Sequence, residues 1–150
     1  FRNENGNCRL IMLEKSLTTI TKLKVRFHEC DPLQIVWHGN YLKYFEEGRE
    51  DFGREHGISY LDAKAEGFST PIVKSVCEHK LPLKYSDSFT VETTFKNSDA
   101  AKINFSYKIY KGDNLICTGE TTQVFLDKNR ELVLNNPPFF LDWKKKMKLL

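Results

Sequence analysis

Apolar and polar residues alternate along residues 18–27, and a period of two predicts a half-buried strand. Its apolar face would carry Leu23, Val25 and Phe27, with basic residues at the positions between them. A loop over residues 28–39 is predicted next, because the Asp31-Pro32 pair disfavours helical backbone at the residue before the proline.

Residues 40–56 have the spacing of one face of an amphipathic helix. The residues on that face are Tyr41, Tyr44, Phe45, Gly48 and Phe52. Asn40 suits the N-cap of this helix and Gly57 its C′ position. Because Gly48 lies on the apolar face, we expect the helix to approach a sheet closely there. A shorter helical pattern follows over residues 60–66.

Four further alternating segments predict strands over residues 73–81, 89–95, 103–109 and about 115–126. Pro82 suits an edge or a bulge of the first of these, and Pro137-Pro138 would open a short C-terminal helix. Short connections favour antiparallel pairing. The order therefore predicts an α+β fold, in which one long helix covers one face of a sheet that ends in a four-stranded meander. Apolar or amphipathic residues left on the outer sheet face would suit a partner subunit.

Length and charge limit the class of protein. The 150 residues suit one domain, which we place at residues 18–150 after an extension at 1–17, with Met12 as a possible native start. The net charge of +3 comes from tail lysines, without which 19 basic residues face 20 acidic ones. These are Lys144, Lys145, Lys146 and Lys148. We expect a solvated tail and no nucleic-acid-binding face.

The cysteines and the apolar runs bear on where in the cell the protein is expected to lie. Cys8, Cys30, Cys77 and Cys117 are scattered and form no CxxC pair, which favours free thiols in a reducing cytosol. No apolar run approaches the roughly 20 residues of a membrane span, and the N-terminus has no signal-peptide pattern. We therefore expect a cytoplasmic protein that does not insert into membranes.

Several kinds of chemistry lack their motifs. The chain has no G-x-S-x-G elbow for a nucleophilic serine, and neither G-x-x-x-x-G-K-[ST] nor G-x-G-x-x-G for phosphate binding. His28, Cys30 and His38 do not have the paired spacing of metal ligands and need a fourth ligand from elsewhere. We therefore expect no metal site.

The loop before the long helix offers a different chemistry. Asp31 precedes the helix start, where backbone N–H groups lack partners and the helix dipole is positive. Such groups polarise a carbonyl, while a nearby carboxylate attacks it or activates water. This pairing suits acyl transfer or hydrolysis. Three plainer readings stay open here: Asp31-Pro32 as a simple turn, His38 as a surface residue or cap, and Trp37 as a core residue.

At this loop the sequence resembles a known family. Residues 30–46 read Cys-Asp-Pro-Leu-Gln-Ile-Val-Trp-His-Gly-Asn-Tyr-Leu-Lys-Tyr-Phe-Glu. They are similar to the signature of hotdog-fold acyl-CoA thioesterases, both the 4-hydroxybenzoyl-CoA thioesterase type and the Tol-Pal-associated type. The likeness extends through residues 69–73 and 81–87 and continues weakly to about residue 127.

The resemblance implies a five-stranded antiparallel sheet wrapped around one long helix, and acyl-CoA as the substrate. It implies that Asp31 is the catalytic nucleophile or general base. The backbone N–H of His38 would bind the thioester carbonyl, and its side chain would take part as well. Trp37 and Gly39, which flank His38, are candidates for substrate binding. The residues that match the family's acyl-pocket segment are Thr70, Pro71 and Ile72.

The resemblance also implies an assembly, with active sites between the subunits of a homodimer or of a homotetramer built as a dimer of dimers, and no cofactor. Some positions depart from the pattern. Phe27 stands where the Tol-Pal-associated type has a tyrosine, and Gln34 stands where glycine is common. Lys80 and Lys84 are candidates for the CoA phosphates on charge alone.

Glu46 is the alternative catalytic acid, because another hotdog branch uses a glutamate on the helix; a structural carboxylate is the plainer reading. Two alternatives to a thioesterase remain on the same fold. One is a module that binds or senses acyl-CoA without catalysis. The other is a dehydratase or hydratase.

Overall fold

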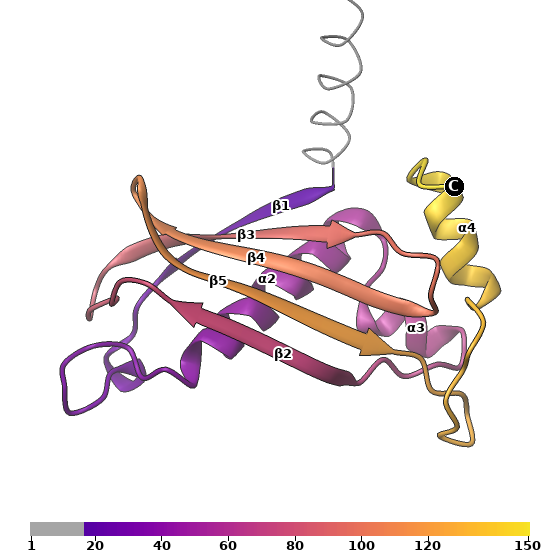
Figure 1. The fold of residues 1–150 in the computed structure, drawn as a ribbon, viewed down its shortest axis with the longest axis horizontal. Helices are drawn as coiled ribbons and strands as arrows, with labels where there is room; N and C mark the ends of the chain where they lie inside the picture. Colours follow the sequence, from indigo (N-terminus) through magenta and orange to yellow (C-terminus); the bar gives the residue numbers. More distant parts are fainter. Residues whose placement is uncertain (1–16) are drawn as a thin grey trace, which may run out of the picture.

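The computed structural model describes residues 17–150, in which five strands form one antiparallel sheet (Figure 1). The strands are β1 (Thr18–Lys24), β2 (Ile72–His79), β3 (Ser88–Lys96), β4 (Lys102–Lys111) and β5 (Asn114–Val124). The helices are η1 (Phe27–Glu29), α2 (Asn40–His56), α3 (Tyr60–Ala65) and α4 (Pro138–Lys146). The long helix α2 lies against one face of the sheet, so the predicted α+β arrangement of a sheet wrapped around one helix is confirmed.

The order of the strands differs from the prediction. The sheet runs β1-β3-β4-β5-β2, so only β3, β4 and β5 form a meander, and β2 pairs with β5 at the far edge. Alternation shows which residues share a face of a strand but not which strand lies beside it. Leu81, predicted to continue β2, lies beyond its end, since the chain leaves the sheet there to reach β3.

Strand β1 is shorter than predicted. Leu23 and Val25 face inward as expected, but the strand ends at Lys24, and Phe27 lies in η1 with 79% of its surface exposed. The prediction that Phe27 faces the core was therefore wrong. The alternation fails because Val25 is held by a backbone bond to Asp87, after which the chain turns into η1.

Helix α2 has the predicted bounds, but its first residue does not have the predicted role. Gly39, rather than Asn40, occupies the N-cap position. The buried Asn40 side chain instead donates from Nδ2 to the Glu29 carbonyl at 2.7 Å, which ties the helix start to η1. At the other end Gly57 has a φ of 71°, the left-handed conformation expected at C′.

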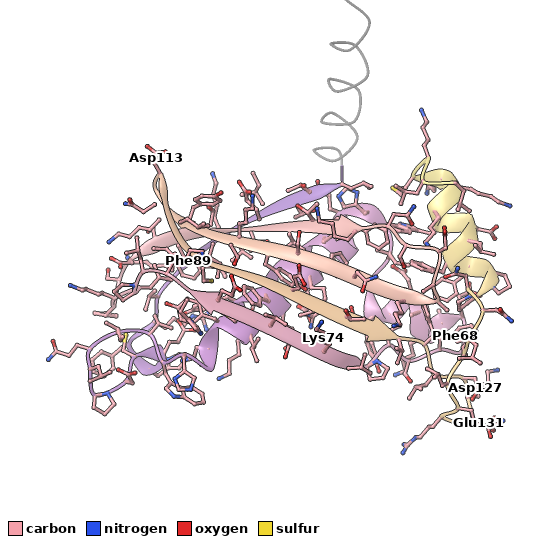
Figure 2. The ribbon with its side chains drawn as sticks, in the orientation of Figure 1. Phe68, Lys74, Phe89, Asp113, Asp127 and Glu131 are labelled. Carbon is pink, nitrogen blue, oxygen red and sulfur yellow. The ribbon has the colours of Figure 1, made fainter. Side chains whose placement is uncertain are left out.

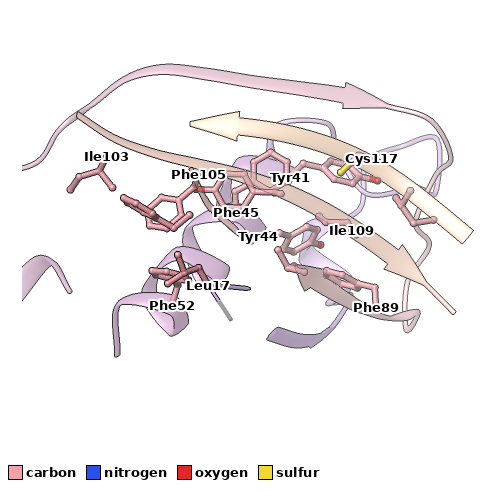
Figure 3. Close-up of a cluster of buried hydrophobic side chains, with 14 of the residues drawn as sticks. Leu17, Tyr41, Tyr44, Phe45, Phe52, Phe89, Ile103, Phe105, Ile109 and Cys117 are labelled. Carbon is pink, nitrogen blue, oxygen red and sulfur yellow. The ribbon is translucent and has the colours of Figure 1, made fainter. Parts of the chain in front are cut away.

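The core lies between α2 and the sheet (Figure 3). The Phe45 ring stacks on Tyr107 with centroids 4.4 Å apart. A Cβ at Gly48 would collide with Thr93 Oγ1, so the predicted close approach of helix and sheet is confirmed. Burying such aromatic side chains contributes roughly 2–3 kcal/mol each, which fixes α2 over β3 and β4.

Helix α4 closes one end of this core. Trp143 Nε1 donates to the His56 carbonyl at 2.7 Å, where α2 ends. Lys144 is 1% exposed, donates from Nζ to the Ser98 carbonyl at 2.7 Å, and lies 4.7 Å from the centre of the Phe140 ring. The prediction of a solvated tail was therefore wrong for Lys144, because its stem packs into the aromatic cluster. It is right for Lys145, Lys146 and Lys148.

The remaining expectations concern cysteines and membranes. Cys30, Cys77 and Cys117 are free thiols, as predicted. Cys8, Met12 and most of the expected extension lie outside the described residues, so the division of the chain at residue 18 stays a prediction. No helix within residues 17–150 combines the length and the hydropathy that a membrane span requires.

Candidate active site

The predicted catalytic loop is a small hairpin. The amide of Asp31 donates to the Ile35 carbonyl at 2.9 Å, and the amide of Trp37 donates to the Glu29 carbonyl at 3.0 Å. The amide of Val36 donates to the Leu83 carbonyl at 2.8 Å, which attaches the hairpin to the segment after β2. Asp31 and the start of α2 therefore lie on adjacent antiparallel segments of a rigid loop.

The Asp31 carboxylate is oriented by the turn that it opens. Its Oδ1 accepts the amide of Leu33 at 2.8 Å, as in an Asx turn. Its Oδ2 has no hydrogen-bond partner among residues 17–150, so one oxygen positions the group while the other stays available. Gln34 has a φ of 65°, a left-handed conformation that glycine adopts most easily. This explains why glycine suits that position in the resembling family.

The start of α2 presents two backbone donors. The amide of Asn40 donates to the Trp37 carbonyl at 2.9 Å, and the amide of Tyr41 approaches the His38 carbonyl at 3.4 Å. Within the described part of the chain, the amides of His38 and Gly39 donate to no acceptor. Because they lie at the positive end of the helix dipole, they can bind a carbonyl oxygen that gains negative charge.

Trp37 and His38 lie over this helix start. A Cβ at Gly39 would collide with the Trp37 ring, so the indole lies directly against the backbone of Gly39. The centroids of the Trp37 and His38 rings are 5.0 Å apart, and both side chains are exposed. Trp37 is thus not a core residue. Its exposed ring and its contact with Gly39 suit a wall beside the two free amides.

The predicted acyl-pocket residues line a separate cavity of about 740 Å³. Thr70, Pro71 and Ile72 form one side of it, and α2 and α3 form the other. Its apolar wall includes Ile58, Leu61, Ile103 and Phe105. Gln123 Nε2 donates to the Thr70 carbonyl at 2.7 Å, which fixes this segment to β5. An acyl group of moderate size would find an apolar environment here.

Polar groups on α2 enter the same cavity. Arg49 Nη1 donates to the Tyr107 hydroxyl at 3.2 Å, and that hydroxyl lies 2.6 Å from Thr121 Oγ1. Burial raises the pKa of Tyr107, which keeps its hydroxyl neutral. Glu46 also lines the cavity and makes no ion pair with any described residue. Its pairing with Arg49, which the helix spacing suggests, does not occur.

The structure divides the predicted site residues into two groups. Asp31, Trp37, His38 and Gly39 line neither large cavity, whereas the 70–72 segment lines the one just described. Strand β2 separates the groups, because Ile72 begins it, while His79, at its end, lies 4.9 Å from the Tyr41 ring in the first turn of α2. Seven strand residues span about 23 Å, so one chain does not bring both groups together.

The structure also locates the candidate metal ligands and the two lysines considered for the CoA phosphates. Among residues 17–150 no group of three or more His, Cys, Asp or Glu side chains could hold a metal ion, so His28, Cys30 and His38 do not converge. Lys80 and Lys84 line neither cavity. Sequence reasoning missed Arg49 as a cavity residue. Its position three residues after Glu46, on the same side of α2, was the signal available.

Comparisons with known proteins agree with the fold. The family model of the thioesterase-like superfamily matches residues 25–144. A protein of Aquifex aeolicus (strain VF5), provisionally named an esterase, is 33% identical over 114 residues, which cover 76% of this chain and 88% of that protein. An acyl-CoA thioester hydrolase of Escherichia coli O157:H7 is 23% identical over 101 residues, covering 66% of this chain and 75% of its own.

A solved structure gives the same result for the architecture. The DHNA-CoA thioesterase of Staphylococcus aureus superposes with a TM-score of 0.79 at 23% sequence identity, covering 89% of this chain and 92% of that one. This likeness shows the hotdog fold. The match of the family model to most of the sequence, together with the Aquifex relative, shows that the chain belongs to the thioesterase-like superfamily.

Proposed function

We propose that this protein hydrolyses acyl-CoA thioesters to a carboxylic acid and free CoA. The observation that carries the proposal is that one hairpin holds both the Asp31 carboxylate, which has one unbonded oxygen, and the free amides of His38 and Gly39 at the start of α2. A carboxylate and two unsatisfied donors on one loop are groups that an acyl-transfer reaction can use. The names of the E. coli and S. aureus relatives support the same class of substrate.

The reaction follows from these groups. The thioester carbonyl oxygen accepts hydrogen bonds from the free amides, which stabilise the negative charge that develops as the carbon is attacked. Asp31 either attacks that carbon, giving an acyl-aspartyl anhydride that water then hydrolyses, or removes a proton from the attacking water. In both routes the C–S bond breaks and the thiolate leaves as CoA after taking up a proton. We assign the supply of this proton to His38, whose side chain is exposed at the start of α2.

A second copy of the chain would complete the site. Both faces of β2 are largely exposed along its length, and its free edge has no strand beside it among the described residues. If two β2 strands pair antiparallel about a two-fold axis, the start of each lies beside the end of the other. Ile72 of one subunit then approaches the Asp31 loop of its partner. We infer a homodimer, or a pair of such dimers, with active sites between subunits.

The test is release of free thiol from a panel of acyl-CoA esters of different chain length and aromatic character. Wild-type protein should turn over at least one class. Asp31→Asn should lower kcat roughly 100- to 10,000-fold, as expected when a positioned acid–base or nucleophilic group is removed. Its fold should not change, because the amide oxygen of asparagine can still accept the Leu33 bond.

Glu46→Gln is the matched control. It replaces the other candidate carboxylate with a neutral amide, so it changes the net charge by the same amount as Asp31→Asn. Retention of activity in Asp31→Asn together with its loss in Glu46→Gln would transfer the catalytic role to Glu46. Saturable binding of acyl-CoA with no thiol release from any ester would indicate a binding module in place of an enzyme.

A further inference from the structure

A second hollow, of about 1210 Å³, carries no residue that the proposed reaction uses. It lies between the end of β1, η1, the first turns of α2 and the β4–β5 hairpin. In Figure 2, Phe89 at the start of β3 and Asp113 at the hairpin tip mark this end of the sheet. We call this hollow the η1 groove.

The η1 groove contains an excess of positive charge. Its basic residues are Lys22, Lys24, Arg26 and Lys43, and its acidic residues are Glu29 and Glu47. None of the four basic side chains makes an ion pair with any residue between 17 and 150. Cations gathered in a concave site without partners attract an anion, and the groove walls strengthen that attraction by excluding part of the solvent.

Aromatic groups lie in the same groove. Phe27 and Tyr85 are 79% and 59% exposed, with ring centroids 5.6 Å apart and planes at 88°. The Tyr44 hydroxyl is buried and has no hydrogen-bond partner of acceptable geometry among the described residues. Burial, followed by the nearby Glu29 carboxylate, raises the pKa of Tyr44, so its hydroxyl stays protonated beside the groove. The two exposed rings suit a planar ligand.

We propose that the η1 groove binds the phosphorylated adenosine end of CoA. The phosphates would contact Lys24, Arg26 and Lys43, and the adenine would lie against the Phe27–Tyr85 pair. This inference rests on the proposed function for the identity of the ligand. It also gives Phe27 a role, although the position departs from the tyrosine of the resembling family.

The position of the groove suits this role. Glu29 lines it and lies two residues before Asp31, so their Cα atoms are within about 7 Å of each other. The pantetheine arm would run from the groove past η1 to the free amides. A nucleotide fits better than the acidic surface of a carrier protein, because the aromatic pair lies inside a hollow, where a flat protein surface would not reach it.

Binding of adenosine 3′,5′-bisphosphate, measured by calorimetry, tests the proposal without any turnover. Arg26→Gln and Lys43→Gln should each weaken binding roughly threefold to tenfold, through loss of a charge-assisted contact. The matched control is Lys102→Gln, which neutralises an exposed lysine on β4 outside the groove and should not change the affinity.

Kinetics give the second readout. With acyl-pantetheine in place of acyl-CoA, KM should rise and kcat should change little, and the groove variants should no longer affect KM. Equal bisphosphate affinity in wild type and groove variants, or equal KM for the two substrates, would overturn the inference while thioester hydrolysis stands. Groove variants that raise KM only for an acyl carrier protein substrate would also overturn the inference. Loss of thiol release with intact, variant-sensitive bisphosphate binding would contradict the proposed function instead.

Discussion

The two edge strands of the sheet have different surroundings. The inner face of β1 is covered by α2, and two threonines on it bind helix carboxylates: Thr19 to Glu55 and Thr21 to Asp51, each at 2.7 Å. The other edge, β2, has exposed residues on both faces, including Val73 and Val76. One chain therefore covers the inner face of β1 and leaves both faces of β2 exposed.

This difference explains why the predicted site residues divide into two groups. Exposed apolar side chains on a free strand edge favour association. The β2 side is also where the 70–72 segment and the polar face of α2 meet. An edge that joins a second copy there would bring an Asp31 loop to each cavity that residues 70–72 line. The end of β1, on the opposite edge of the sheet, lines the η1 groove.

The largest expected effect comes from placing charge on the open edge. In the double variant Val73→Glu, Val76→Glu, like charges would face each other across the proposed two-fold axis, and the protein should become monomeric. Activity should fall by roughly 100-fold or more, since the catalytic groups would lose their geometry. Sedimentation and thiol release measure the two effects.

Ile20→Glu on β1 is the matched control, because Ile20 is an apolar edge residue as exposed as Val73, at 59%. It should change neither mass nor activity. A double variant on β2 that stays dimeric and active would show that β2 is not the interface.

A smaller effect is expected from the face of α2 that packs on the sheet. Gly48→Ala would push its Cβ against Thr93 and should lower the free energy of unfolding by about 1–2 kcal/mol, because overpacking exceeds the gain in helix propensity. Glu46→Ala, on the face of α2 toward the acyl cavity, should stay within about 0.5 kcal/mol of wild type. Urea unfolding of both variants measures the contrast, and equal losses would contradict the close packing of α2 on β3.

The smallest effect concerns the link between β1 and α2. The hydrogen bond from Thr21 lowers the pKa of Asp51, against the opposing effect of partial burial. A carboxyl with a lowered pKa in the folded state stabilises the fold above its unfolded pKa of about 3.9, and this stabilisation is lost as pH falls through the folded value.

Thr21→Val should therefore cost about 0.5–1 kcal/mol at pH 7, and the difference from wild type should shrink as the pH is lowered below about 4. Unfolding curves at several pH values give the comparison. A difference that does not depend on pH would mean that packing, and not the Asp51 charge, gives Thr21 its effect.

The sequence predicted the elements better than their arrangement. Periodicity identified α2 and all five strands, because alternation and helical spacing are local properties. It could not place β2 beside β5, since edge position depends on pairing between distant segments. Lys144 was assigned to solvent because its neighbours in sequence are lysines, whereas its burial depends on the aromatic cluster around α4.

The site was predictable in the same uneven way. Asp31 and the helix start are neighbours in sequence, so local reasoning could select them together as candidates. The η1 groove is lined by residues from several elements, so no single segment of the sequence indicates it. The predicted catalytic roles of Asp31 and His38, and the acyl-pocket role of Thr70, Pro71 and Ile72, stay predictions that the experiments above test.

The most direct test of a site shared between subunits is complementation. Asp31→Asn and Pro71→Trp, a variant that fills the acyl cavity, should each be dimeric and inactive alone. After the two are unfolded together and refolded, half of the dimers are mixed, and each mixed dimer has one intact site. The account predicts recovery of about a quarter of wild-type activity. No recovery above the parent proteins, with mixed dimers demonstrated by mass, would contradict it.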